Sequence, residues 1–187
     1  DRLTGTGIRY KLPQARPRPF RLNSIFMAAA AAARKRLANE RKNFRKQKPF
    51  GFFARPEKNK DGSQNLFKWL CGFPGKKGTA WEGGRYKVVL TFPEDFPSNP
   101  PSARFEPKIY HPNVFDDGSI CLSILKPDKN WAASLSVSQI LLGIQALLDD
   151  PNCEDPANQP ASAMYTKKRD KYDKKIREQA KEFSGDP

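Results

Sequence analysis

Hydrophobic residues are spaced at a helical period near the start of this chain, at a strand period in the middle, and at a helical period again towards the end. Met27 to Lys46 has a narrow apolar stripe, formed by Ala30, Ala33, Leu37 and Phe44. A second face carries Arg34, Arg41 and Arg45. Pro49 and Gly51 end the pattern, so we predict a helix that docks by its apolar stripe and exposes a cationic face.

The segment from Phe52 to Phe105 is typical of strands, because short aromatic and β-branched runs alternate with turn signals. Asp61-Gly62 marks one hairpin and Gly83-Gly84 a second. Apolar residues alternate at period two over Tyr86, Val88, Leu90 and Phe92. These features predict an antiparallel meander, followed by proline-rich segments that suit extended chain outside a sheet.

The last third of the chain is predicted to be helical. Ser136 and Gln139 have the spacing of a capping box, and apolar residues then keep a helical spacing as far as Pro151. One or two further helices are expected from about Ala157 to Glu182, the last of them charged, around Lys167 to Arg177, with its apolar points at Tyr165, Tyr172 and Ile176. Helices grouped around one antiparallel sheet make an α+β domain.

A length of 187 residues with 37% apolar content suits one folded domain. Residues 1–26 are basic, contain several prolines and lack periodicity. They predict a flexible basic extension, either an expression artefact or a translated leader. Residues 27–187 then form the folded domain. The longest apolar run, Met27 to Ala33, is too short to cross a bilayer, so we expect no membrane association.

The net charge of +14 is concentrated at the front of the chain. Residues 1–50 contain 14 Lys and Arg against two acidic residues, whereas residues 51–187 contain 20 against 18. This asymmetry predicts an acidic partner for the N-terminal part, whether a protein face, nucleic acid or a membrane surface. A charged face that is merely solvated is the alternative.

The three cysteines, Cys71, Cys121 and Cys153, form no CxxC pair, and His111 is the only histidine. We therefore expect no disulfide framework and no metal site. A reducing compartment, cytosol or nucleus, is the simplest location, because free thiols survive there. Chemistry at a free thiol remains open.

The densest motif is His111-Pro112-Asn113, with Cys121 eight residues after Asn113. With Phe96 to Pro101 upstream and Trp131 downstream, it resembles the catalytic segment of ubiquitin-like-protein conjugating enzymes. A lone cysteine is otherwise more often a small core residue. The resemblance runs from about Arg34 to Phe183 and implies the ubiquitin-conjugating (UBC) fold, a four-stranded antiparallel meander sheet with an N-terminal helix and C-terminal helices packed around it.

Three segments resemble the SUMO branch of this family: the long first hairpin Lys58 to Asn65, the stretch Lys126 to Asn130, and Pro74 to Gly84. The resemblance implies that SUMO is carried as a thioester on Cys121 and passed to lysine amines. It implies SUMO, its activating enzyme, SUMO ligases and lysine-bearing proteins as partners. No cofactor is expected, because the activating enzyme consumes the ATP. A monomer in the nucleus and cytoplasm is expected.

The resemblance assigns catalytic roles to Cys121, Asn113 and Asp155. Asn113 is expected to stabilise the oxyanion or to brace the loop that does so, and Asp155 to orient the acceptor lysine. Local alternatives are a turn residue for Asn113 and a helix cap for Asp155. His111 and Pro112 are expected to have structural roles in the loop, since a catalytic Cys–His pair would need the base to face the sulfur.

The resemblance also implies two binding surfaces. The surface for the acceptor lysine and substrate consists of Arg104, Phe115, Asp117, Ser119, Asp128, Lys129, Pro156 and Ala157. The surface for SUMO and the activating enzyme consists of Arg41, Lys42, Arg45 and Lys46. Cys71 is expected in a strand, and Cys153 is an accessory thiol.

The chain departs from the branch at three places. Phe115 and Ser162 stand where tyrosines are usual, and Ala132-Ala133 replaces a typical arginine and proline. The first two departures bear on acceptor preference and the third on ligase docking.

Three other functions remain as alternatives. A ubiquitin-specific conjugating enzyme is disfavoured by the two longer segments and the basic helix. A catalytically dead variant of the fold would lack the cysteine. Nucleic-acid binding through the basic front would need aromatic residues interleaved with the cations, and these are missing.

Overall fold

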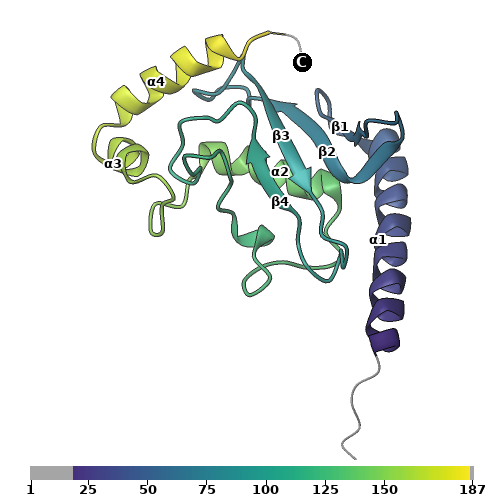
Figure 1. Ribbon diagram of the computed structural model, residues 1–187. Coiled ribbons are helices and arrows are strands. Elements are labelled where there is room, and N and C mark those ends of the chain that lie inside the picture. The colour runs from purple at the N-terminus through teal and green to yellow at the C-terminus, as the bar shows by residue number, and fades with distance from the viewer. Residues whose placement is uncertain (1–18, 186–187) are drawn as a thin grey trace, which may run out of the picture.

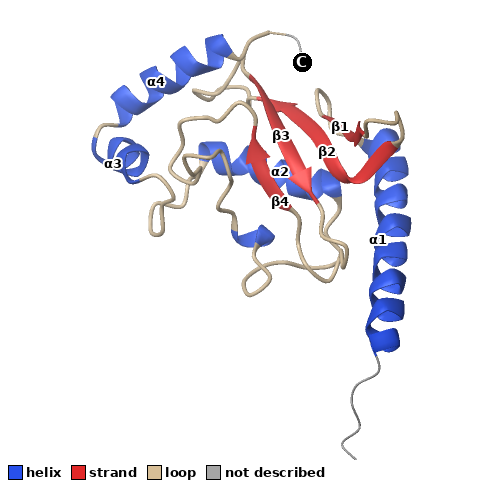
Figure 2. Ribbon diagram, viewed as in Figure 1, coloured by secondary structure: helices blue, strands red, loops and turns tan. Residues whose placement is uncertain are grey.

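A four-stranded antiparallel sheet with the order β1-β2-β3-β4 lies at the centre of the computed structural model, which describes residues 19–185 (Figures 1 and 2). The strands are β1 (Phe53–Lys58), β2 (Gln64–Pro74), β3 (Arg85–Thr91) and β4 (Ser102–Phe105). Each strand pairs with its neighbour in sequence. The predicted α+β class and the meander are therefore confirmed.

The two predicted hairpins differ in how they turn. Asp61-Gly62 forms a tight turn, in which Gly62 has a φ of +82° and the Asp61 carboxylate accepts the N–H of Ser63 at 2.9 Å. The second connection is longer than a two-residue turn, because it occupies residues 75–84. It closes where the N–H of Gly75 donates to the carbonyl of Gly84 at 2.9 Å.

Helix α1 (Pro19–Gln47) begins eight residues before the predicted start at Met27. The predicted boundary between residues 26 and 27 therefore falls inside this helix, and residues 1–18 of the predicted extension lie outside the described residues. Proline suits the first turn of a helix, and neither proline nor glycine follows until Pro49. The purple end of α1 in Figure 1 extends past the sheet, and Met27 is 76% exposed there.

The apolar stripe of α1 docks as predicted, with Ala33, Leu37 and Phe44 buried. The helix lies beside β1 and β2 and also contacts α2 (Val137–Asp149). None of the described helices has a stretch that is both long enough and apolar enough to cross a bilayer.

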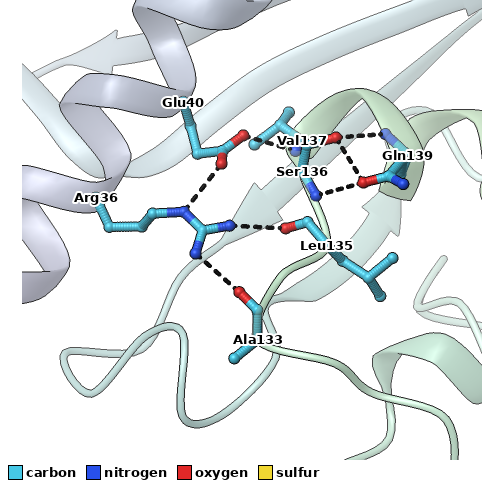
Figure 3. A network of polar contacts seen from close by, with 7 residues as sticks. All are labelled: Arg36, Glu40, Ala133, Leu135, Ser136, Val137 and Gln139. Atoms are coloured by element: carbon cyan, nitrogen blue, oxygen red, sulfur yellow. Dashed lines mark hydrogen bonds and ion pairs between the residues drawn. The ribbon is translucent and has the colours of Figure 1, made fainter.

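A partly buried ion pair fastens α1 to the segment before α2 (Figure 3). The Nε of Arg36 donates to the Glu40 carboxylate at 2.9 Å, and Glu40 is only 6% exposed. The other two guanidinium nitrogens of Arg36 donate to the carbonyls of Ala133 and Leu135, at 2.8 and 3.0 Å. One arginine thus holds the loop that contains Ala132-Ala133 against α1.

The N-terminus of α2 is capped twice. The predicted capping box between Ser136 and Gln139 is confirmed. In addition, the Glu40 carboxylate accepts the N–H of Val137 at 2.9 Å. A carboxylate at this end of a helix satisfies a free donor and is attracted by the helix dipole. The start of α2 is therefore fixed both by its own capping box and by a side chain of α1.

Helix α2 buries its apolar face against the sheet, with Val137, Ile140, Leu141, Ile144, Leu147 and Leu148 in the core. Two further helices follow, α3 (Gln159–Lys167) and α4 (Arg169–Glu182). Tyr165 belongs to α3, not to the last helix, and its ring meets that of Tyr172 edge to face at 5.2 Å. In Figure 1, α3 and α4 lie on the side of the sheet away from α1.

Candidate active site

A tight turn after β4 places Cys121. Gly118 has a φ of +87°, and a Cβ there would lie 2.7 Å from the carbonyl of Phe105, so only glycine fits. Ser119 donates its backbone N–H to the Asp117 carboxylate at 2.9 Å. The chain then returns alongside itself, and the N–H of Cys121 donates to the carbonyl of Asn113 at 2.9 Å.

The side chain of Cys121 is half-buried and lines a cavity of about 330 Å³. The cavity is closed on one side by the end of α2 and by the segment after it, which contribute Leu147, Asp150, Pro151, Asn152 and Asp155. The structure therefore places the predicted nucleophile and the predicted acceptor-orienting carboxylate in the same cavity. Lys129, from the predicted substrate surface, lines it too.

Asn113 joins the cysteine loop to the segment after α2. Its side-chain amide donates to the carbonyl of Asn152 at 2.7 Å and accepts the N–H of Asn152 at 2.8 Å. Its own carbonyl holds Cys121, and the residue is 1% exposed. These contacts are those of a brace, which is one of the two catalytic contributions expected for Asn113. They also go beyond a local turn, because the partner is 39 residues away.

His111 is fully buried, and both of its ring nitrogens are used by the backbone. The N–H of Asn113 donates to Nδ1 at 3.0 Å, so Nε2 carries the proton and donates to the carbonyl of Leu147 at 3.0 Å. Burial lowers the pKa of His111 to about 4. The ring is therefore neutral and has no nitrogen free to act as a base on the sulfur. Pro112 is buried beside it, and its carbonyl accepts the N–H of Asn158.

Asp155 is exposed and does not cap a helix, so the helix-cap alternative is wrong. The cap of α3 is Asn158, whose side-chain oxygen accepts the N–H of Ala161 at 3.0 Å. Asparagine performs this role as well as aspartate does, and Pro160 follows within the first turn. The carboxylate of Asp155 is left free to face the cavity of Cys121.

Lys126 is a residue of this site that the sequence analysis did not single out. It lines the cavity with Cys121 and follows the 3-10 turn Ser123–Leu125. The pKa of Lys126 is raised, first by a side-chain hydrogen bond to Cys121 and then by the charges of Cys121, Asp155 and Asp128. From the sequence, Lys126 was included only in the stretch Lys126 to Asn130, which resembles the SUMO branch.

The remaining residues of the predicted substrate surface fall into two groups around Cys121. Phe115, which is 46% exposed, and Ala157 line a neighbouring groove of about 460 Å³. The backbone of Arg104 forms an isolated antiparallel β-bridge with that of Ser119, and its side chain forms an ion pair with Glu106. Hydrogen bonds from Ser119, aided by the charge of Arg104, lower the pKa of Asp117.

The last three positions singled out in the sequence are Asp128, Pro156 and Ser162. Asp128 is exposed and attracts Lys126. Pro156 is half-buried, and in the sequence it lies between Asp155, which lines the cavity, and Ala157, which lines the groove. Ser162 is only 6% exposed and lines neither space, so it is a packed residue of α3.

The predicted partner surface of α1 is a separate feature. Arg41, Lys42, Arg45 and Lys46 line one open hollow of about 430 Å³. Arg41 also donates to the side chain of Gln64 at the start of β2. The helix lies on the other side of the sheet from α3 and α4 (Figure 2).

The other cysteines differ from Cys121. Cys71 is buried in β2, as predicted, and burial raises the pKa of its thiol. Cys153 is half-buried and free but does not line the cavity of Cys121. Within the described part of the chain, no three side chains among His, Cys, Asp and Glu are grouped so that they could hold a metal ion.

Comparisons with known proteins agree with this geometry. The sequence profile of the family described as "Ubiquitin-conjugating enzyme" matches residues 36–180. The SUMO-conjugating enzyme UBC9 of Caenorhabditis elegans is 49% identical over 160 residues, which cover 86% of this chain and 95% of that protein. The Sumo-conjugating enzyme ubc9 of Dictyostelium discoideum is 48% identical over 157 residues, which cover 84% of this chain and 98% of that protein. Both similarities extend along nearly the whole relative.

Proposed function

The chain belongs to the ubiquitin-conjugating enzyme family and to its SUMO-conjugating branch, and we propose from this premise that it accepts SUMO as a thioester on Cys121 and transfers it to lysine amines. It is a transferase that forms isopeptide bonds. The observation that carries the residue assignments is the cavity shared by Cys121 and Asp155, because it joins a nucleophile to a carboxylate that caps no helix and forms no hydrogen bond or ion pair among the described residues.

In the charging step, the thiolate of Cys121 attacks the thioester carbonyl that links SUMO to the activating enzyme. A new C–S bond forms to Cys121, and the old C–S bond breaks with release of the activating enzyme's thiolate. The buried, neutral His111 does not take part as a base. A sulfur with no histidine base beside it also suits storage of the thioester, because a strong base would activate water against it.

In the discharge step, a neutral lysine amine attacks the thioester carbonyl. The C–N bond of the isopeptide forms, the C–S bond breaks, the thiolate returns to Cys121, and a proton leaves the amine. An acceptor lysine is protonated at neutral pH, since its ordinary pKa is about 10.4. We assign Asp155 to position this cation, and Asn113 to hold the loop of Cys121 against Asn152 while charge develops on the carbonyl oxygen.

We assign the cationic hollow of α1 to SUMO and its activating enzyme. Four basic side chains face solvent together there, and charge complementarity of this kind speeds association with an acidic partner. SUMO ligases and lysine-bearing proteins complete the proposed set of partners. The curated relatives favour SUMO over ubiquitin as the modifier. A monomeric state, a nuclear and cytoplasmic location and the lack of a cofactor stay predictions.

A charging assay tests the proposed function. The chain is incubated with ATP, SUMO and the SUMO-activating enzyme, and in parallel with ubiquitin and its activating enzyme, and the intact mass is measured. We expect one SUMO adduct that thiol removes, present in Cys153→Ala and absent in Cys121→Ala. A thiol-sensitive adduct that persists on Cys121→Ala would sink the assignment of the nucleophile. Charging with ubiquitin alone would assign the enzyme to the other branch.

A further inference from the structure

We propose that the groove between the turn at Phe115 and α4 takes the part of a substrate polypeptide that flanks the acceptor lysine, and that Lys175 selects an acidic residue in that part. This inference rests on the proposed transfer to lysine, and it names a feature of the proteins that the enzyme modifies. It adds a specificity-determining residue that lies outside the acceptor surface assigned above.

Three segments that are distant in sequence are tied together around this groove. The Oε1 of Gln179, in α4, accepts the N–H of Tyr110 at 2.7 Å. The N–H of Asn158, at the start of α3, donates to the carbonyl of Pro112 at 2.9 Å. The walls of the groove are therefore held by the fold itself, before any substrate binds.

The groove continues from the cavity of Cys121. Asp155 lines the cavity, and Ala157, two residues further along, lines the groove. Two residues of extended chain span at most about 7 Å. A substrate lysine that enters the cavity therefore leaves its neighbours on one side at the edge of the groove. The groove volume of about 460 Å³ has room for a few side chains, since ligand sites are typically about 300–1,000 Å³.

Part of the groove lining is apolar. Tyr110, Phe115 and Ala157 contribute to it, and Phe115 is one of the few large apolar side chains that the fold leaves exposed. A substrate segment laid over these side chains would remove apolar surface from water. The groove therefore suits a polypeptide better than a small charged ligand.

The two lysines of the groove differ in whether their charge is neutralised. The Nζ of Lys108 lies 3.8 Å from the carboxylate of Asp116 and donates to the carbonyl of the same residue at 3.2 Å. The Nζ of Lys175 lies 4.1 Å from the centroid of the Tyr110 ring and has no ion pair among residues 19–185. The ring attracts the ammonium and holds it at the groove. An acidic side chain is the complement of this uncompensated charge.

The test uses the full chain, charged with SUMO and then freed of ATP. Discharge is measured to peptides that have one lysine, neutral neighbours and a single glutamate moved along either side of that lysine. Lys175→Ala removes the charge at the groove, and Lys175→Glu reverses it. Lys174→Glu is the matched control, because Lys174 is exposed on the same helix but does not line the groove. Free lysine, which is too small to reach both spaces, is the reference acceptor.

We expect glutamate at one or more positions, at least about two residues from the acceptor lysine, to lower the half-saturating peptide concentration. The effect should be roughly two- to fivefold, as for a partly exposed ion pair, and should leave the maximal discharge rate unchanged. The preference should be lost in Lys175→Ala, pass to arginine at the same positions in Lys175→Glu, and persist in Lys174→Glu. Discharge to free lysine should be equal in all four enzymes.

Two results would overturn the proposal. One is a glutamate series with the same half-saturating concentrations in Lys175→Glu as in the wild type, and the other is an equal change in Lys174→Glu. Both leave the transfer itself intact. If no thiol-sensitive SUMO adduct forms, or if it does not discharge to free lysine, the proposed function itself fails.

Discussion

Asn113 and Asn152 are joined by two hydrogen bonds. The side-chain amide of Asn113 pairs with both the N–H and the carbonyl of Asn152, 39 residues away. This pair ties the loop of Cys121 to the segment that carries Asp155. The catalytic geometry therefore depends on a side chain that is itself almost entirely buried.

Replacing Asn113 tests this brace. We expect Asn113→Ala to slow discharge by roughly 10²-fold or more and to lower the free energy of unfolding by about 1–3 kcal/mol, because two hydrogen bonds to the backbone of Asn152 are lost. Asn152→Ala is the control, since Asn152 contributes only its backbone to the pair. Lysine discharge and urea unfolding are measured for both. Lost discharge with wild-type stability would show that the amide acts on the oxyanion instead.

Asp155 should separate the two half-reactions. In charging, the nucleophile is the enzyme's own thiolate, so Asp155→Ala should charge at a near-normal rate. In discharge, the acceptor cation loses its nearby opposite charge, and the rate should fall about tenfold or more, with partial recovery as the pH rises towards the lysine pKa. Single-turnover discharge of precharged enzyme at several pH values measures this. Equal rates for both enzymes throughout would leave the exposed carboxylate without a catalytic role.

The cationic hollow of α1 should control charging. Reversal of Arg41, Lys42, Arg45 and Lys46 to Glu is expected to slow charging and to weaken noncovalent SUMO binding without unfolding the domain. Wild-type charging should also slow with salt, because the Debye length shortens from about 10 Å at 0.1 M to about 3 Å at 1 M.

The matched control for this series reverses four exposed basic residues of α4, namely Lys171, Lys174, Arg177 and Lys181. It changes the net charge by the same amount at a different place. If both series slow charging equally, the effect comes from net charge, and the assignment of the hollow is wrong.

Glu40 should contribute to stability through the start of α2. We expect Glu40→Ala to lower the free energy of unfolding by about 1–3 kcal/mol, since it leaves the N–H of Val137 and the Nε of Arg36 without their acceptor. Glu57→Ala removes an exposed ion pair with Lys68 and should cost about 0–1 kcal/mol. Urea unfolding compares the two, and equal losses would contradict the capping role.

His111 should make the domain sensitive to acid. Its pKa is about 4 in the folded protein, against an ordinary value of 6.5, so the unfolded chain binds the proton first as the pH falls. The stability that depends on a neutral ring is complete above about pH 6.5 and is lost progressively down to about pH 4, by up to roughly 3 kcal/mol. Urea unfolding between pH 7 and pH 4 measures the slope. His111→Gln should be less stable at pH 7 and should lose less on acidification, whereas an identical slope would exclude this linkage.

The sequence by itself determined the features that depend on neighbouring residues. The reactive loop was identified by the resemblance of the segment from His111 to Cys121 to a known family. Period-two alternation identified the central strand, and Ser136 and Gln139 identified the start of α2. Each of these signals lies within a few residues, where backbone geometry relates side-chain direction to spacing. For the same reason, the apolar stripe of α1 was recognised from sequence alone.

Only the tertiary structure decided which distant groups meet. Asn113 binds the backbone of Asn152, and Glu40 caps a helix 97 residues further along the chain. Neither pairing leaves a periodic trace in the sequence, because a hydrogen bond between separate segments depends on how the whole chain packs. The same holds for Asp155, for which a local rule offered a helix cap as the alternative role, whereas the structure gives that cap to Asn158. Lys126 became part of the site only once a short turn and the end of α2 enclosed it with Cys121 in one cavity.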